Sequence, residues 1–209
     1  CVALVLKGIQ MPRPRKLLSI GHSYVVPLNR RLANEMQRLA GDRWEIACVA
    51  PSHFHGSRDL RSIAFQPDKH DLARVEAIDV RWTSRVHLFH YKRRLKRLMA
   101  EGWDVIHAWE EPFILAGAQL ASYAPRDAAL IYATFQNLPK TYPPPFNWFE
   151  SYALNRAKGW IAFGNTVADA LAGRPCYRAR PMRLIPPGVD VQSFSPDPSA
   201  RKQIHTQLG

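Results

Sequence analysis

The stretch KLLSIGHSYVVPLNRRLANEMQRLAGDRWEIACVA, residues 16–50, decides the fold class. It begins with a short apolar segment at 16–23, continues with a helical pattern at 27–40, and ends with a second apolar segment at 44–50. Pro27 fits the first turn of a helix, where its missing N–H costs nothing. A strand, a helix and a strand in immediate succession predict two parallel strands joined by a helical crossover.

The helical pattern at 27–40 separates apolar from polar positions. One face carries Leu28, Leu32, Met36 and Leu39. The positions off that face are Arg30, Arg31, Gln37 and Arg38. A spacing of three and four residues is typical of an amphipathic helix, so we expect the apolar face to pack on the sheet and the arginines to face water.

The same alternation continues along the chain. Apolar strand patterns stand at 75–82, 86–89, 103–109, 128–135, 159–163 and 182–185. Helical patterns stand at 91–100, 113–123, 146–157, 165–172 and 199–208. Residues 51–74 are typical of a long loop with one irregular helix. Near-continuous apolar strands alternating with helices predict an α/β protein with a Rossmann-like, doubly wound, mainly parallel sheet. Ligands of such sheets bind at the carboxyl ends of the strands.

Length and composition are those of a globular protein. The 209 residues are 46% hydrophobic and 22% charged, which excludes wholesale disorder. No apolar run approaches the roughly 20 residues needed to span a bilayer. The three cysteines are far apart, and Cys48 lies inside an apolar strand pattern, so we expect a buried thiol and a reducing, cytoplasmic setting. The basic run after Met11 indicates that residues 1–13 are a disordered or non-native leader.

Charge is the unusual property of the chain. Lys and Arg total 29 against 17 Asp and Glu, a net charge of +12 with His neutral. This excess points to an anionic partner, which can be nucleic acid, an anionic membrane face or a phosphorylated substrate. The helical pattern at 91–100 concentrates part of it in Lys92, Arg93, Arg94, Lys96 and Arg97. Such a run is a solvated helix face, a contact with anionic lipid, or a contact with nucleic-acid phosphates.

Candidate ligand-binding residues follow the first predicted strand as Gly21, His22, Ser23 and Tyr24. One interpretation is a phosphate site, in which a glycine lets backbone N–H groups approach an anion near a helix start. The other is an ordinary turn between a strand and a helix. The segment matches neither G-x-G-x-x-G nor a Walker loop. Because Val25 occupies the place of the second glycine in G-x-S-x-G, Ser23 is not a lipase-type nucleophile.

Two carboxylates and a polar loop follow later strands. Glu110 and Glu111 stand between the strand at 103–109 and the next helix, where they can bind sugar hydroxyls, take up a proton, or simply favour the positive end of that helix. Gln136, Asn137 and Lys140 follow the strand at 128–135 and are either part of a proline-stiffened connector or groups for a polar, hydroxyl-rich ligand.

Histidine spacing gives no prediction of a metal site. The pairs His53-x-His55 and His87-x-x-His90 lack a third ligand in a zinc spacing, so we expect neither a metal nor a cofactor.

The chain resembles the N-terminal domain of the retaining glycosyltransferases of family 4, which place two Rossmann-like domains around a cleft in the GT-B fold. The residues that carry the resemblance are Ile185-Pro186-Pro187-Gly188-Val189-Asp190 followed by Phe194 and Pro196, Asp104-Val105-Ile106-His107-Ala108-Trp109, and Gly159-Trp160-Ile161-Ala162-Phe163. The resemblance covers residues 14–209, and the IPPGVD stretch is its most specific part.

The resemblance implies the domain organisation. Residues 14–190 correspond to the acceptor-side domain, and residues 191–209 to a linker and the start of a second domain that binds the nucleotide-sugar donor. That second domain carries two glutamates with seven residues between them, a spacing that no pair of glutamates here has. The expectation is an acceptor-binding domain that is inactive without its other half.

The resemblance also implies roles for residues. Gly21 and His22 lie on the loop that meets the donor diphosphate, where family members commonly have two glycines. Gln136 occupies the place of a histidine that contacts the transferred sugar, and a neutral amide can bind a hydroxyl but cannot act as a base. The acceptor proton then passes to the leaving phosphate.

Further expectations follow for the partners. Glu110 and Glu111 join Gln136 in the catalytic set, and Ser23, Tyr24, Asn137 and Lys140 contact a saccharide or lipid-linked acceptor. The basic helix then docks on the inner face of the cell membrane. Two other hypotheses compete: a basic Rossmann-like module for nucleic acid, which has the charge but no recognised motif, and an unrelated enzyme of flavodoxin-like build.

Overall fold

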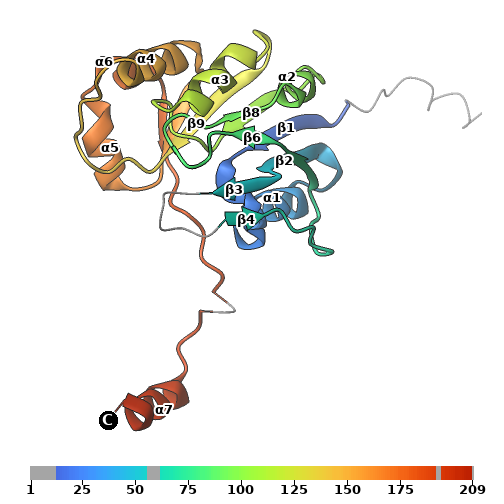
Figure 1. Cartoon of the computed structure of the whole chain (residues 1–209). Helices are drawn as coiled ribbons and strands as arrows, with labels where there is room; N and C mark the ends of the chain where they lie inside the picture. Colours follow the sequence, from blue (N-terminus) through green and yellow to red (C-terminus); the bar gives the residue numbers. More distant parts are fainter. Residues whose placement is uncertain (1–12, 56–61, 192–193, 209) are drawn as a thin grey trace, which may run out of the picture.

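The computed structural model of the chain describes residues 13–55, 62–191 and 194–208 (Figure 1). The strands are β1 (Arg15–Ile20), β2 (Trp44–Pro51), β3 (His53–His55), β4 (Ser62–Ala64), β5 (Arg74–Ile78), β6 (Val80–Arg81), β7 (His90–Tyr91), β8 (Val105–Ala108), β9 (Ala129–Thr134), β10 (Gly159–Ala162) and β11 (Met182–Leu184). The α-helices are α1 (Pro27–Ala40), α2 (Arg94–Met99), α3 (Leu115–Tyr123), α4 (Phe146–Arg156), α5 (Asn165–Ala172), α6 (Pro175–Arg178) and α7 (Pro198–Leu208). Two short 3-10 helices are η1 (His22–Val25) and η2 (Gly41–Arg43).

The predicted leader at 1–13 falls almost entirely on residues 1–12, which lie outside the described residues. Its last residue, Arg13, is described. The Arg13 guanidinium donates to the Asp104 carboxylate at 3.0 Å, just before β8.

The main sheet is parallel and doubly wound. Within the described residues, seven strands pair in the order β11-β10-β9-β8-β1-β2-β5. From β1 the chain runs outward through β2 to β5, and then returns to β8 and runs the other way to β11. The predicted α/β, Rossmann-like fold is therefore confirmed. The strand order reverses between β1 and β8. A ligand is therefore expected at the carboxyl ends of these two strands, which we call the carboxyl edge of the sheet.

Helices cover the two faces of this sheet unequally. Figure 1 shows α1 on one side and α2, α3 and α4 on the other. The side of α2 to α4 holds the larger core, to which Leu18, Ile106 and Tyr132 contribute with no measurable exposure. The side of α1 holds a smaller core around Tyr24 and the buried thiol of Cys48. Burial raises the pKa of Cys48 to about 12, as expected for an inert core thiol.

The prediction that the leucine face of α1 packs on the sheet is wrong. The helix buries Arg30 and Ala33, whereas Leu28 and Leu39 are 62% and 68% exposed. The Arg30 guanidinium is fully buried because all of its sides find partners: Nε donates to Asp71 at 2.9 Å, Nη1 to the Tyr24 carbonyl and Nη2 to the Gln66 carbonyl. Asp71 lies far along the chain from the helix, so periodicity within α1 gives no sign of this pairing.

Two antiparallel ribbons lie between β2 and α2, where the sequence predicts a long loop and a separate strand. Part of the predicted loop at 51–74 forms the ribbon of β3 and β4. The prediction of a strand at 86–89 is wrong, because these residues form turns between β6 and β7. The second ribbon pairs β6 with β7, with Val80 opposite Tyr91. This pairing draws Tyr91 out of the predicted helix at 91–100, so that α2 begins only at Arg94.

The C-terminal segment leaves the sheet after β11. Its predicted helix is confirmed as α7, which lies apart from the sheet and its helices in Figure 1. Asp190 accepts a hydrogen bond from Arg31 at 3.0 Å and so ties the start of this segment to α1. Among the described residues, no helix is both long and apolar enough to cross a bilayer.

Candidate functional site

The loop after β1 packs against the end of β8. Gly21 has an extended backbone, with φ at −161°, so its conformation does not require glycine. The space around it favours glycine, because a Cβ at Gly21 would lie 3.1 Å from both the Cβ and the carbonyl oxygen of Trp109, tighter than most real contacts. The Gly21 N–H donates to the Val49 carbonyl at 3.3 Å, which extends the bonding of the sheet. In this structure, glycine thus serves close packing between β1 and β8.

Glu110 is a buried anchor for that loop. Its side chain has no exposed surface, and its two oxygens accept three hydrogen bonds. One oxygen accepts from the His22 backbone N–H at 2.6 Å and from the Tyr91 hydroxyl at 2.8 Å, and the other binds His22 Nδ1 at 2.6 Å. A carboxylate with these contacts holds neighbouring groups in place and does not face the open edge of the sheet.

His22 is the residue that faces outward from this anchor. Its ring lies between Phe54, stacked at 5.0 Å, and Phe89, edge-on at 5.4 Å, and its side chain is 34% exposed. Burial lowers the pKa of His22, but the charge and hydrogen bond of Glu110 raise it, and the net pKa lies above the ordinary value of 6.5. Nδ1 contacts Glu110, whereas Nε2 has no protein partner among the described residues.

Glu111 supports the next strand. It accepts hydrogen bonds from the Thr134 hydroxyl at 2.5 Å and the Phe135 N–H at 2.8 Å, so it holds the end of β9. Burial raises the pKa of Glu111, although these two hydrogen bonds oppose the shift. The backbone of Glu111 packs closely against Gly117 on α3. This close approach requires glycine, because a Cβ at residue 117 would overlap the Glu111 carbonyl oxygen.

The loop after β9 places its predicted residues at different depths. Gln136 is only 9% exposed and its Oε1 has no hydrogen-bond partner among the described residues, while its Nε2 donates to the Leu138 carbonyl at 3.3 Å. Asn137 and Lys140 are exposed. The Arg174 side chain binds the Lys140 carbonyl and Glu150, which fastens this loop to α4. A buried amide oxygen without a partner is a rare feature that a hydroxyl ligand can satisfy.

The two remaining residues of the first loop differ in exposure. Tyr24 is fully buried, and its hydroxyl lies 2.6 Å from Ser19 Oγ, which lies 2.7 Å from His107 Nδ1. This buried chain of polar groups supports the loop from within the core. Ser23 is half-buried, and its hydroxyl has no partner among the described residues.

An aromatic cluster lies at the same edge. Each of the adjacent strands β8, β9 and β10 is followed directly by an aromatic residue. These residues are Trp109, Phe135 and Phe163, respectively. Phe135 stacks on Phe163 at 4.1 Å and on Trp109 at 6.0 Å, and it remains 48% exposed. None of these three residues was predicted to belong to a site, although the position that they share is visible in the strand patterns.

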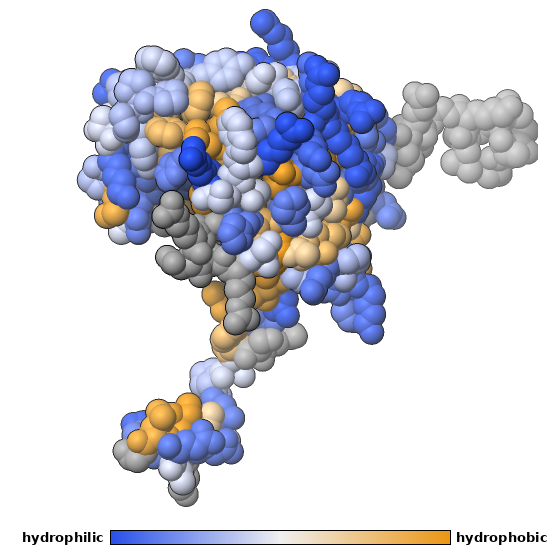
Figure 2. Space-filling model, viewed as in Figure 1, coloured by the Kyte–Doolittle hydropathy of each residue, from blue (hydrophilic) through white to orange (hydrophobic). Residues whose placement is uncertain are grey.

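The basic helix α2 lies outside this edge and is partly neutralised. Lys92 pairs with Asp79 at 2.7 Å and Arg94 with Glu76 at 2.5 Å. Arg93, Lys96 and Arg97 are exposed, and in the part of the chain described no acidic partner is recorded for them. Figure 2 shows hydrophilic side chains gathered over the region of α2.

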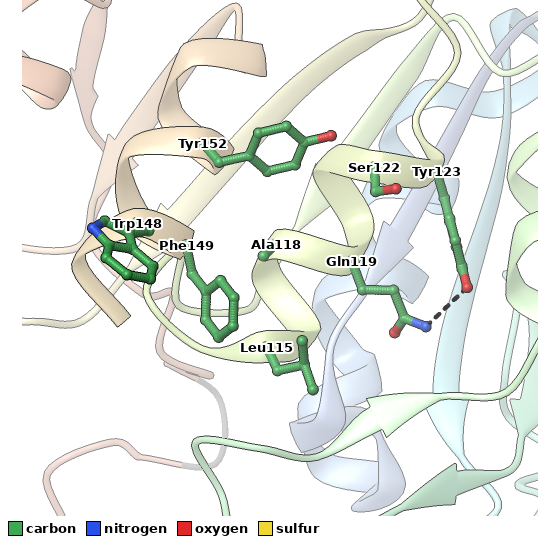
Figure 3. A pocket seen from close by; sticks show the side chains of 8 residues that line it. All are labelled: Leu115, Ala118, Gln119, Ser122, Tyr123, Trp148, Phe149 and Tyr152. Atoms are coloured by element: carbon green, nitrogen blue, oxygen red, sulfur yellow. Dashed lines mark hydrogen bonds between the residues drawn. The ribbon is translucent and has the colours of Figure 1, made fainter. Parts of the chain in front are cut away.

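A separate groove lies between α3 and α4 (Figure 3). It has a volume of about 450 Å³ and is mainly apolar. Its lining residues are Leu115, Ala118, Gln119, Ser122, Tyr123, Trp148, Phe149 and Tyr152. None of the residues predicted for ligand binding lines it. The described residues contain no cluster of three or more side chains suited to a metal.

A doubly wound, parallel sheet with helices on both faces defines a Rossmann-like α/β domain. The model of Glycosyltransferase Family 4 matches residues 28–193. The chain therefore belongs to glycosyltransferase family 4.

The solved structures include a similar fold. The crystal structure of Anabaena HepE (Alr3699) in complex with UDP and glucose matches 93% of this chain with a TM-score of 0.60 and 18% sequence identity. The match covers 50% of the HepE chain, so the present chain spans about half the length of that protein. A comparison with curated proteins gives no match.

Proposed function

We propose that this chain is the acceptor-binding half of a glycosyltransferase. The complete enzyme transfers a sugar from a nucleotide-sugar donor to a saccharide or lipid-linked acceptor with retention, and a second domain after residues 191–209 binds most of the donor. The observation that carries the proposal is the family match over 28–193, in a chain whose fold matches half of HepE. That HepE was solved with UDP and glucose supports a nucleotide-sugar donor.

The edge residues take the following roles in the proposal. Gln136 accepts a hydrogen bond from a sugar hydroxyl through Oε1, which has no partner within the described residues. Ser23, Asn137 and Lys140 contact the acceptor. Glu111 fixes the end of β9 beneath them. Tyr24 acts through the core, because its hydroxyl is buried.

The proposed chemistry is compatible with the neutral character of Gln136. An amide cannot remove a proton from the acceptor hydroxyl near neutral pH. In the proposed reaction the bond between the sugar C1 and the donor phosphate oxygen breaks, and the bond between C1 and the acceptor oxygen forms on the same face. The acceptor proton passes to the leaving phosphate, so the step needs neither a metal nor a protein base.

The test is transfer by a complete protein that contains this chain. It is incubated with UDP- and GDP-sugars and with saccharide or lipid-linked acceptors, and the product and its anomeric configuration are determined by NMR. We expect transfer with retention, and none from residues 1–209 alone. Transfer or donor hydrolysis by residues 1–209 at an ordinary enzymatic rate would contradict the assignment to half an enzyme, and an inactive complete protein would contradict the function.

A variant pair tests the role of Gln136. Replacing Gln136 with Ala removes the proposed hydroxyl contact, for which we expect a decrease in kcat/KM of about tenfold or more. Gln66→Ala is the control, because that side chain is exposed and lies on a loop beside α1. Equal activity of the two variants would remove Gln136 from the site.

A basic binding module is the second candidate, favoured by the net charge of +12. Salt-dependent binding to DNA in a gel shift, without flotation on anionic vesicles, would support nucleic acid as the partner.

A further inference from the structure

The loop after β1 offers a side chain, not its first two backbone N–H groups, to an anion. The Gly21 N–H is bonded to Val49 and the His22 N–H to Glu110, so both are used within the protein. A loop that bound phosphate through these two N–H groups would have to break a sheet bond and a bond to a buried carboxylate. Among the described side chains of this loop, the nitrogen left without a protein partner is His22 Nε2.

The orientation of that nitrogen is restrained by contacts of the His22 ring with Glu110, Phe54 and Phe89. Glu110 binds the backbone N–H and Nδ1 of His22 with its two oxygens, which restrains both the main chain and the ring. Phe54 and Phe89 contact the ring from β3 and from the residue before β7. Because Nδ1 is turned to the buried carboxylate, Nε2 is directed away from it. A ring held this way is preorganised for a ligand.

We propose that the imidazolium of His22 donates a hydrogen bond from Nε2 to a phosphate of the nucleotide-sugar donor, and that Glu110 positions the ring for this contact. The proposal rests on the proposed function and deepens it. It assigns to a cationic side chain the contact that a glycine pair would make with its backbone. A hydrogen bond from a charged donor to phosphate is about twice as strong as a neutral one, and its strength depends on the protonation of the ring.

The charged groups around the ring favour its protonated form. Glu110 and Glu111 follow β8 and are acidic, and Tyr91 on β7 donates to Glu110. Burial raises the pKa of Tyr91 well above its usual value, so it stays neutral. The other packed neighbours, Phe54 and Phe89, carry no charge. The raised pKa of His22 follows from these surroundings and supports a cation near neutral pH.

The experiment is an NMR titration of the whole chain with inorganic diphosphate. Histidine side chains are labelled, and the pKa of His22 is measured with and without diphosphate. We expect diphosphate to shift the His22 resonances and to raise its pKa further, because the anion binds the protonated ring more tightly. Binding should weaken as pH rises through that pKa. Unchanged resonances and an unchanged pKa at millimolar diphosphate would overturn the proposal.

Variants separate the contact from a merely structural role. His22→Gln should weaken diphosphate binding about tenfold, because it removes a charged hydrogen bond. His70→Gln makes the same replacement at an exposed turn and should bind like the parent protein. Glu110→Gln keeps a polar partner for the ring but removes the charge, so it should move the pH midpoint of binding to lower pH while binding at low pH persists. Equal binding by all variants would overturn the proposal.

Failure of the His22 contact can be distinguished from failure of the proposed glycosyltransferase function. If diphosphate does not contact His22 but the complete protein transfers sugar, only the His22 contact fails. If His22 binds diphosphate but the complete protein transfers no sugar, the phosphate site is real and the proposed reaction is wrong. A pH profile that falls on the acid side of the His22 pKa would show that the ring acts as a base and would overturn its role as a donor.

Discussion

Glu110 and Glu111 are neighbours in the chain but serve different strands. Glu110 holds the loop after β1 through His22, and Glu111 holds the end of β9 through Thr134 and Phe135. Their position after a strand predicts side chains at the carboxyl ends of the strands, but both carboxylates are bonded to the protein and lie beneath those ends. Two adjacent acidic residues can thus hold two different strand ends, β1 and β9, because successive side chains after a strand point in different directions.

The buried His107 gives a prediction at the scale of one residue. Burial lowers the pKa of His107 to about 4, so the folded protein resists a proton that the unfolded chain binds at about 6.5. Stability should therefore fall as pH decreases from about 6.5 to about 4, by at most about 3 kcal/mol from this residue. Urea unfolding at several pH values measures the effect.

Variants isolate the contribution of His107 from that of titrating carboxylates. His107→Asn should lower stability at pH 7 but show a shallower loss toward pH 4.5. His70→Gln replaces an exposed histidine and should keep the slope of the parent protein. Identical slopes for all three proteins would mean that His107 does not resist protonation.

At the scale of elements, the strands were predictable and the orientation of α1 was not. Strands of the main sheet are short apolar runs, and the pattern predicts them within a few residues of their observed bounds. The burial of Arg30 depends on Asp71 and on the carbonyls of Tyr24 and Gln66, which only the folded chain brings together. Likewise His22 meets Glu110 across 88 residues of sequence. Local periodicity cannot report contacts of this range.

The buried pair of α1 gives the second prediction. Arg30→Met leaves Asp71 without its cation, and we expect a loss of about 3–5 kcal/mol in the free energy of unfolding, because an uncompensated charge remains buried. Arg38→Met on the same helix removes an exposed pair with Glu35 and should cost less than about 1 kcal/mol. Denaturant unfolding of both variants tests the difference, and equal losses would contradict it.

The start of α3 gives the third prediction. Gly117→Ala places a Cβ against the Glu111 carbonyl oxygen, closer than any real contact, so the helix or the loop must shift. We expect a loss of about 1–3 kcal/mol, typical of overpacking. Gly173→Ala is the control, because nothing lies within 4 Å of its Cβ and its φ is −75°. A thermal shift for Gly117→Ala no larger than that for Gly173→Ala would exclude this close contact.

For the whole molecule, attraction to an anionic membrane should depend less on the net charge than on which basic side chains lack an acidic partner. Of the basic residues predicted to contact a membrane, Lys92 and Arg94 have acidic partners, whereas Arg93, Lys96 and Arg97 have none within the described residues. Attraction to an anionic surface should therefore depend mainly on these three unpaired side chains. The sequence predicts the basic helix, but the partners on β5 and beside it appear only after folding.

Vesicle flotation tests this fourth prediction. Arg93→Glu with Arg97→Glu should weaken binding to phosphatidylserine-containing vesicles about tenfold or more, since each basic residue near the surface contributes about 1 kcal/mol. Arg126→Glu with Arg178→Glu changes the net charge equally at exposed sites outside α2 and should have a smaller effect. Equal effects would indicate attraction through overall charge, and no binding by the parent protein would exclude an anionic bilayer as partner.

The outward leucines of α1 bear on how the chain behaves in the laboratory. Leu28, Leu32 and Leu39 are 62%, 36% and 68% exposed along one helix. Apolar side chains that lie together on a surface favour self-association as concentration rises. Sample preparation for spectroscopy should therefore benefit from glutamine at these three positions, which leaves the inward-facing Arg30 and Ala33 undisturbed.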